Sequence, residues 1–323
     1  MKRRRFLQWA GGLGIAATLP LPAIAQSDDD PQDIYDRLNQ SLDLRFVVAG
    51  GNIHVAIDGN ATLLDKHRIE GWVHRSASAV AAYFGRFSVE QWGLLVTLND
   101  GIHIGPATTW GHPRSITQIA LGRNISDGAL HNDWVMVHEM THLALPTAPQ
   151  HSVWFMEGNA TYVEPIARAQ LGQLTPQEVW RWAVDDMPKG QPHDGDEGLD
   201  HTHTWARTYW GGAMYWLLAE IAIYKNSGGR HRLQDALRAI NRASGGNSSF
   251  WSVEQTVRVG AAAVQGDALS SLYRELKDRP ITIDLHDALQ QLGISDVEGA
   301  IRFDDHAPLA ELRRSITTLQ GPT

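Results

Sequence analysis

The sequence contains no cysteine among its 323 residues. Disulfide bonds, thiolate metal ligands and a thiol nucleophile are therefore all excluded. Any metal ion that the chain binds must be held by histidine, aspartate or glutamate. The chain has 15 histidines and 36 acidic residues, so candidate ligands of these types are plentiful.

The sequence also lacks an apolar run of roughly eighteen residues, the length that a transmembrane helix needs. No stable insertion into a membrane is therefore expected. Basic residues number 28 against 36 acidic ones, which gives a formal net charge of −8. Nucleic acid is not expected as a partner, because phosphate binding needs a basic face. Twelve tryptophans and a hydrophobic content of 43% instead indicate a globular protein with a well-packed core.

Residues 1–25 have the features of an export signal. A basic start precedes a Gly/Ala-rich, mildly apolar stretch that ends in the small-x-small sequence AIA at 23–25. The segment RRRFLQ at 3–8 resembles a twin-arginine signal. We expect the mature chain to begin near Gln26, in the periplasm or outside the cell, with a net charge of −12 (24 basic minus 36 acidic residues). A short amphipathic helix or a membrane anchor is the alternative interpretation.

The rest of the chain divides into two halves with different patterns. Up to residue 145, one helical pattern at 62–84 lies among short β-rich segments at 44–50, 53–57, 92–98, 102–104 and 115–121. The first two segments are separated by Gly-Gly-Asn, which predicts a hairpin. After Pro146, helical patterns dominate, at 153–171, 175–187, 205–225 and 230–242. We therefore expect an α+β fold with a sheet-and-helix half at 26–145 and a mostly helical half at 146–323. A cleft between two such halves is a favoured place for a site.

The segment 138–142 reads His-Glu-Met-Thr-His, which is the HExxH pattern. A helix is expected at about 130–144, and positions i and i+4 share one helix face, so His138 and His142 can bind the same ion. Glu139 follows the first ligand directly, where its carboxylate can act as a general base. The surrounding segment is largely apolar, and burying polar side chains there is costly unless they coordinate a metal. Two partly buried histidines on an amphipathic helix are the alternative.

A catalytic zinc ion needs a third protein ligand and one open position. The pattern HExxHxxGxxH is excluded, because its last two fixed positions hold Leu145 and Ala148. A second cluster, WFMEGNATYVE, follows at 154–164, and a helix starting near residue 153 would place Glu157 on its first turns. Two histidines and one glutamate form a known catalytic zinc set. Glu164 lies two turns further on, either as a partner of a ligand histidine or as an ordinary helix-face carboxylate.

Together the two clusters resemble the gluzincin metallopeptidases, whose second motif is W-x-x-E-G-x-A-x-Y-x-E. Residues 208–240 are similar to the corresponding segment of the aminopeptidase N and glycyl aminopeptidase families, in which a tyrosine three residues before a glycine opens a long helix. The resemblance covers roughly residues 115–295. The matching positions of the second motif are Trp154, Glu157, Gly158, Ala160, Tyr162 and Glu164.

The resemblance implies a thermolysin-like zincin catalytic domain that binds one zinc ion through His138, His142 and Glu157. It also implies that Tyr209 donates a hydrogen bond to the oxyanion of the intermediate, although a buried aromatic role for Tyr209 is the alternative. Two features depart from aminopeptidase N. Fourteen residues (143–156) separate the last two ligands, which is fewer than usual in that family, and no G-x-M-E-N motif occurs upstream.

These features predict an exported zinc-dependent peptidase with a peptide substrate, and leave open whether it cleaves from the amino terminus. A peptide-binding envelope protein with a non-catalytic zinc ion and a hydrolase for other amides are the alternatives. The loop at 193–205, HDGDEGLDHTHTW, is expected to be solvated, with His201 or His203 near the substrate. A second cation bound by this loop is the other interpretation.

Overall fold

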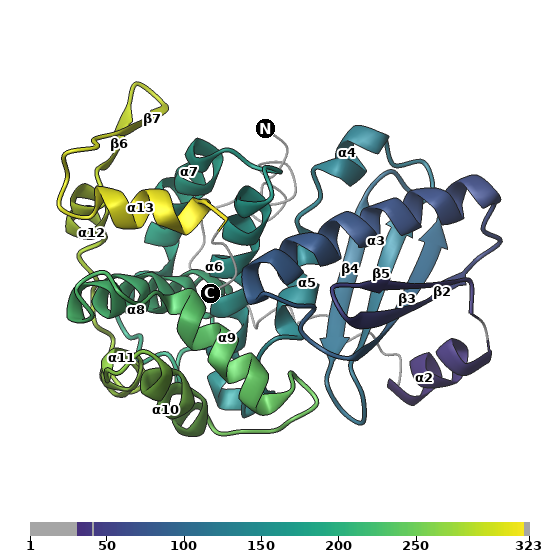
Figure 1. Cartoon of the computed structure of the whole chain (residues 1–323), viewed down its shortest axis with the longest axis horizontal. Helices are drawn as coiled ribbons and strands as arrows, with labels where there is room; N and C mark the ends of the chain where they lie inside the picture. Colours follow the sequence, from purple (N-terminus) through teal and green to yellow (C-terminus); the bar gives the residue numbers. More distant parts are fainter. Residues whose placement is uncertain (1–30, 41, 320–323) are drawn as a thin grey trace.

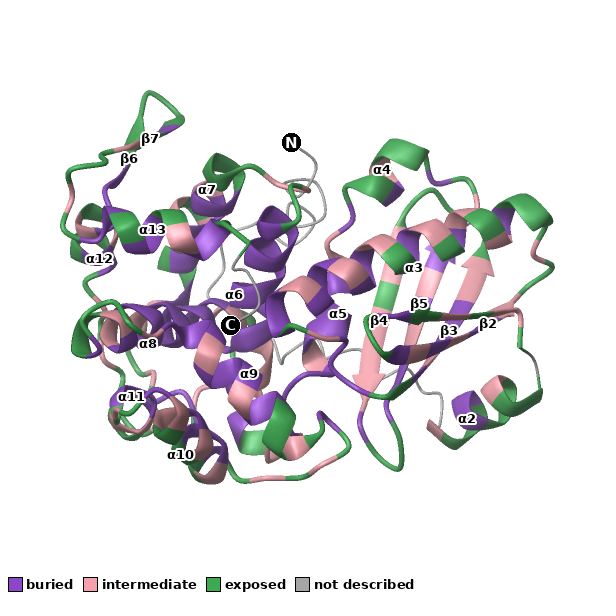
Figure 2. Cartoon of the chain, in the orientation of Figure 1, coloured by how far each residue is buried: buried purple, intermediate pink, exposed green. Residues whose placement is uncertain are grey.

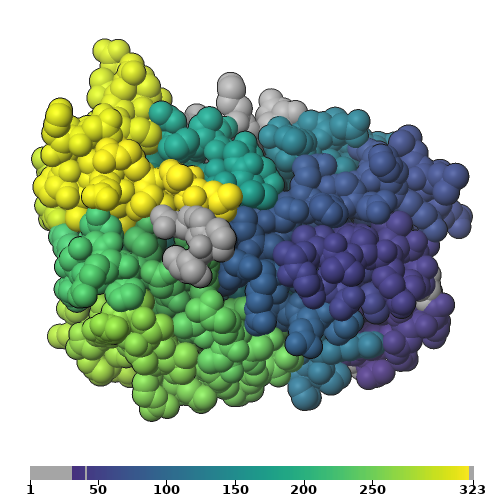
Figure 3. All heavy atoms as spheres, viewed as in Figure 1, coloured from purple at the N-terminus to yellow at the C-terminus, as the bar shows by residue number. Residues whose placement is uncertain are grey.

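The computed structural model describes residues 31–40 and 42–319 (Figure 1). The predicted export signal at 1–25 lies outside these residues. Within them, no helix combines the length and the apolar character that crossing a membrane requires. The sheet-bearing half and the helical half occupy opposite sides of the molecule, as the space-filling view shows (Figure 3).

Five strands form a mixed sheet in the order β1-β2-β3-β5-β4. Strands β2, β3 and β5 are parallel, whereas β1 and β4 are antiparallel to their neighbours. As the last strand in this order, β4 has one side without a strand partner among the described residues. The bounds are Leu44–Val48 for β1, Gly51–Asp58 for β2, Gln91–Asn99 for β3, Ile104–Trp110 for β4 and Ile116–Gly122 for β5.

The predicted hairpin and the long predicted helix are both confirmed. The turn between β1 and β2 consists of Ala49 and Gly50, which have φ values of 45° and 88°, as a two-residue hairpin turn requires. Helix α3 (Leu63–Phe84) begins with a capping box between Thr62 and Asp65. This helix connects the parallel strands β2 and β3 and packs on the sheet (Figure 1).

Two predicted elements were wrong in their bounds. The strand expected at 102–104 is observed as β4 at 104–110. It contains Pro106, which an edge strand tolerates, and the pairing register with β5 shifts at that point. The helix expected at 130–144 is two helices, α4 (Asp127–His131) and α5 (Val135–His142). They are separate because the carboxylate of Asp133 accepts hydrogen bonds from the backbone N–H groups of residues 135 and 136, at 2.9 and 3.0 Å, and so caps α5 anew.

The second half is mostly helical, as expected. Helices α6 and α8 lie in its interior and are largely buried, and the small hairpin β6–β7 projects at one end (Figures 1 and 2). Helix α6 contacts α3 and α5 on the sheet side and α8 on the other. The bounds are Val153–Gln170 for α6, Pro176–Asp186 for α7, Gly212–Asn226 for α8, Leu233–Ser244 for α9, Val253–Ala263 for α10, Ala268–Leu276 for α11, Leu285–Gln291 for α12, Ile294–Val297 for β6, Ala300–Phe303 for β7 and Ala310–Thr317 for α13.

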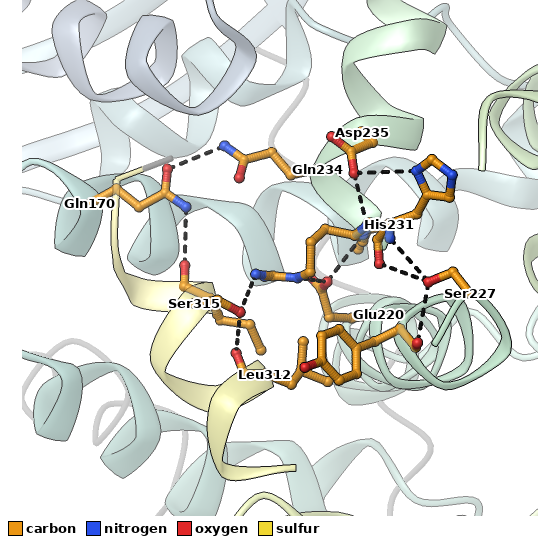
Figure 4. Close-up of polar contacts among 12 residues, drawn as sticks. Gln170, Glu220, Ser227, His231, Gln234, Asp235, Leu312 and Ser315 are labelled. Carbon is orange, nitrogen blue, oxygen red and sulfur yellow. Dashed lines mark hydrogen bonds and ion pairs between the residues drawn. The ribbon is translucent and has the colours of Figure 1, made fainter. Parts of the chain in front are cut away.

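Buried polar contacts connect the helices of this half (Figure 4). Glu220 of α8 is 1% exposed and accepts a hydrogen bond from Nε of Arg232 at 2.6 Å. At the end of α6, Gln170 accepts from Nε2 of Gln234 at 3.3 Å and donates to the carbonyl of Ile316 at 3.0 Å. These contacts attach the C-terminal helix α13 and helix α9 to the buried helix α6.

Candidate metal centre

The two histidines of the HExxH pattern lie on the same face of α5. Their rings are 4.9 Å apart between centroids and nearly perpendicular, at 85°. Other side chains of α5, those of Met136, Val137 and Met140, are fully buried in the core. The helix is therefore fixed by its apolar side chains, and its histidines are left to face α6.

Glu157 approaches both histidines from the first turns of α6, as predicted. Its Oε2 lies 3.1 Å from Nε2 of His138 and 3.4 Å from Nε2 of His142. One ligand atom of each residue lies within 4.8 Å of those of the other two. Among the described residues, no other group of three or more histidines and carboxylates is arranged to hold a metal ion. Two nitrogen ligands and one oxygen ligand fit zinc with one coordination position left open.

The charges of these three candidate ligands are strongly coupled. Burial alone would lower the pKa of His142, but the neighbouring carboxylates, chiefly Glu157, raise it to about 9. Burial alone would raise the pKa of Glu157, but the two histidines hold it far below its usual range. Without metal, the site therefore holds an imidazolium next to a carboxylate at neutral pH. A metal ion must displace this proton, because only neutral imidazole is a ligand.

Glycines allow α6 and α8 to touch next to Glu157. A Cβ atom on Gly158 would lie 2.3 Å from the carbonyl carbon of Gly212, and one on Gly212 would lie 2.3 Å from the carbonyl oxygen of Trp154. The helix expected at 205–225 is confirmed, but it contains a π-helical segment, η4 (Arg207–Gly211), just before Gly212. π-Helical turns often occur at functional sites, and this one carries Tyr209.

Tyr209 lies against His138, the first candidate metal ligand. Its ring stacks on that of His138 with centroids 6.1 Å apart and an interplanar angle of 18°, and on that of Trp205 at 5.7 Å and 27°. Burial, followed by the charges of Glu157 and Glu139, raises the pKa of the Tyr209 phenol. The phenol therefore keeps its proton at neutral pH and is available as a hydrogen-bond donor.

Glu139 is buried beside the three candidate ligands but is not part of their group. Its Oε2 accepts a hydrogen bond of 2.8 Å from Oγ1 of Thr109, which lies on β4. Thr109 could not be identified from the sequence, because it is 30 residues away from Glu139 in a stretch without a clear strand pattern. Only the sheet order, which puts β4 next to α5, brings the two residues together.

Glu164 is fully buried further along α6. Its Oε1 accepts a hydrogen bond of 2.8 Å from Nη1 of Arg168, whose Nη2 donates to the carbonyl of Asn132 between α4 and α5. This ion pair connects α6 to the segment that precedes α5. A direct contact of Glu164 with a ligand histidine stays a prediction.

The loop at 193–205 is held by its own side chains. Asp200 is buried and accepts hydrogen bonds from Nε1 of Trp154 at 2.7 Å and from Oγ of Ser152 at 2.8 Å, at the start of α6. His201 is exposed and lies 3.2 Å from Asp278, and His203 is half-buried. Within the described part of the chain, this loop forms no second group of metal ligands. A role for either histidine in substrate binding stays a prediction.

No protein-family model and no curated protein matches this sequence. The structure is similar to an aminopeptidase N family protein from Idiomarina loihiensis, with a TM-score of 0.57, 12% identity, and coverage of 78% of this chain and 49% of the other. It is also similar to native yeast LTA4 hydrolase, with a TM-score of 0.51, 12% identity, and coverage of 74% and 39%. An M1 zinc metallopeptidase from Deinococcus radiodurans matches with a TM-score of 0.47, 15% identity, and coverage of 76% and 52%.

The chain thus spans about half, or less, of the first two of these structures. At such low identity the similarity shows the fold. The expected α+β zincin-type fold is confirmed, and the resemblance to gluzincin metallopeptidases is confirmed at the level of the fold.

Proposed function

We propose that this chain is a zinc-dependent peptidase in which Glu139 is the general base. The observation that carries the proposal is the grouping of His138, His142 and Glu157, whose ligand atoms lie within 4.8 Å of one another. The carboxylate of Glu139 lies beside this group but is held by Thr109. A structural zinc site is closed by four protein ligands, whereas three ligands next to a carboxylate that is not itself a ligand are typical of a catalytic site.

Each residue of the site has a distinct role in this proposal. His138, His142 and Glu157 would hold one zinc ion. When bound, zinc polarises a substrate carbonyl and lowers the pKa of a water molecule from 15.7 to about 7. Glu139 takes the proton from the attacking water and passes it to the leaving amine. Tyr209 donates a hydrogen bond to the substrate oxygen as negative charge develops on it.

The outer edge of β4, which has no strand partner among the described residues, offers a place for the peptide. β4 is the outer strand of the sheet, and its residue Thr109 contacts the general base. An extended peptide can add to such an edge through backbone hydrogen bonds. A peptide paired with β4 would therefore lie beside Glu139, which supports a peptide as the substrate.

We further propose that the protein is exported to the periplasm or secreted. The support is the basic, then mildly apolar, then small-x-small pattern of residues 1–25. Fractionation of cells that express the full chain, with N-terminal sequencing of the product, tests this. A mature product that begins near Gln26 outside the cytoplasm is expected, and an uncleaved cytoplasmic chain would contradict the proposal.

Metal analysis combined with peptidase assays tests the proposed function. The proteins to compare are the wild type, Glu139→Gln, and Glu70→Gln as a control on the exposed face of α3. We expect one zinc ion in all three, with turnover of fluorogenic peptides lost only in Glu139→Gln. Preference for substrates with a free amino terminus over blocked ones would identify an aminopeptidase, and equal cleavage would identify an endopeptidase. Zinc without turnover of any peptide would favour a binding protein, and absence of zinc would refute the site.

A further inference from the structure

Three side chains of the sheet form a continuous series of hydrogen bonds that ends on Glu139. Nε1 of Trp92 on β3 lies 3.0 Å from Oγ1 of Thr117 on β5. Oγ1 of Thr117 lies 2.8 Å from Oγ1 of Thr109, the residue opposite it on β4. Oγ1 of Thr109 lies 2.8 Å from Oε2 of Glu139. Trp92 and Thr117 are fully buried, so water does not compete for the contact between them.

The chemistry of the two ends fixes the direction of every proton in the series. An indole N–H can only donate, and an ionised carboxylate can only accept. Thr109 has one proton, and the carboxylate of Glu139 takes it, because a charged acceptor gives the stronger hydrogen bond. Thr117 must then donate its own proton to Thr109 and accept from Trp92. All three donors therefore point towards Glu139.

The hydroxyl of Thr109 also lies close to the backbone of Glu139. Oγ1 of Thr109 is 3.3 Å from the carbonyl oxygen of Glu139 and 2.8 Å from Oε2. The side chain of Glu139 is thus folded so that Oε2 faces β4. Because Thr109 is β-branched and lies in a strand, few χ1 rotamers are open to it, and its hydroxyl is a fixed point for the carboxylate.

We propose that Thr109 is a positioning residue that gives the two carboxylate oxygens of Glu139 different roles. It holds Oε2 and leaves Oε1 as the oxygen that accepts the proton. In the proton transfer an O–H bond of water breaks and an Oε1–H bond forms, while Thr109 keeps its own proton and continues to donate to Oε2. Thr117 and Trp92 transfer no proton; they keep the hydroxyl of Thr109 pointed at the carboxylate. The inference rests on the proposed role of Glu139 as the base.

Two substitutions at residue 109 separate the hydroxyl from the rest of the side chain. Thr109→Val keeps the branched shape and removes the hydroxyl, whereas Thr109→Ser keeps the hydroxyl. Thr97→Val is the matched control. Thr97 lies on β3 two residues after Leu95, on the opposite face of the sheet, and this face packs against helix α2 (Pro31–Gln40). All variants are compared for zinc content, kcat and KM on the same fluorogenic peptide.

We expect Thr109→Val to lower kcat by about 10-fold to 100-fold, which is the typical cost of a misplaced catalytic group, and to change KM less than about 3-fold. Thr109→Ser and Thr97→Val should stay within about 3-fold of the wild type in kcat, and zinc content should not change in any variant. Retention of wild-type kcat in Thr109→Val would overturn the inference. An equal loss in Thr109→Ser would also overturn it, because packing of the methyl group would then be the cause.

Crystal structures of the metal-free proteins give a readout that needs no activity. Oε2 of Glu139 should remain within hydrogen-bond distance of residue 109 in the wild type and in Thr109→Ser, and should move away in Thr109→Val. An unmoved carboxylate in Thr109→Val contradicts the inference. If Thr109→Val does not fold, Thr109→Ala replaces it with the same expectations. A wild type without peptidase activity would refute the proposed function, whereas the position of the carboxylate tests Thr109 separately.

Discussion

Gly158 of α6 and Gly212 of α8 bring their helices into backbone contact beside the candidate metal ligands. Glu157 directly precedes Gly158, and Tyr209 lies three residues before Gly212. The contact between the two glycines therefore sets the distance between the third ligand and the phenol. The absence of a side chain at these two positions thus determines the geometry of the site.

Adding a methyl group at this contact should separate the helices. A Cβ on Gly158 would lie 2.3 Å from the backbone of Gly212, so we expect Gly158→Ala to lower the free energy of unfolding by about 1–3 kcal/mol through overpacking. It should also lower kcat, because the two helices carry Glu157 and Tyr209. Gly71→Ala in α3 is the control: its Cβ would meet nothing closer than Arg75 at 3.6 Å, and alanine should stabilise this helix by about 0.5–1 kcal/mol. Equal stability of the two variants in urea unfolding would contradict the close contact.

Removal of the Tyr209 hydroxyl should slow the reaction without loss of metal. We expect Tyr209→Phe to lower kcat by about 100-fold to 1,000-fold, the usual cost of losing one oxyanion donor, with zinc content unchanged. Tyr215→Phe is the matched control, because its buried hydroxyl donates to the carbonyl of Leu269 at 3.0 Å, away from the ligands. Tyr215→Phe should lower stability but leave kcat unchanged. Wild-type kcat in Tyr209→Phe would show that this tyrosine has only a packing role.

Zinc binding should release a proton at neutral pH. The pKa of His142 is raised to about 9, so this imidazole carries a proton at pH 7.5 in the metal-free protein and must lose it to bind zinc. The affinity for zinc should therefore increase as the pH rises towards about 9 and then level off. Titration calorimetry in buffers with different ionisation enthalpies measures the protons released. Binding at pH 7.5 without proton release would contradict the coupling between His142 and Glu157.

The free energy of unfolding should depend strongly on the buried pair of Glu220 and Arg232. Both side chains are at least nine-tenths buried, so Glu220→Gln would leave the guanidinium without its charged partner. We expect this change to cost about 3–5 kcal/mol, the usual effect of breaking a buried pair. Asp58→Asn, which removes the half-exposed partner of Arg37, should cost less than about 1 kcal/mol. Chemical denaturation measures both, and equal effects would contradict the difference in burial.

The sequence was enough to predict the candidate site residues that belong to short motifs with a characteristic spacing. Helical spacing brought His138 and His142 to one face, and the second cluster supplied Glu157 as the third ligand that a catalytic zinc ion needs. The hairpin and the long helix before β3 followed from turn residues and hydrophobic spacing.

The contacts that depend on tertiary structure could not be predicted in the same way. Thr109 contacts Glu139 only because β4 is the outer strand next to α5, and strand order is not written in any single segment. The break before α5 depends on Asp133. Its carboxylate caps the start of a new helix within a segment whose apolar spacing predicts one continuous helix. The interhelical contact at Gly212 depends on how two distant helices cross.

The most direct test of the central claim is to locate zinc in crystals by anomalous diffraction, with data collected on both sides of the zinc absorption edge. We expect one strong anomalous peak per chain, bounded by Nε2 of His138, Nε2 of His142 and the carboxylate of Glu157, and no peak at this place in Glu157→Ala crystals. A peak elsewhere in the protein, or none in zinc-soaked wild-type crystals, would contradict the account.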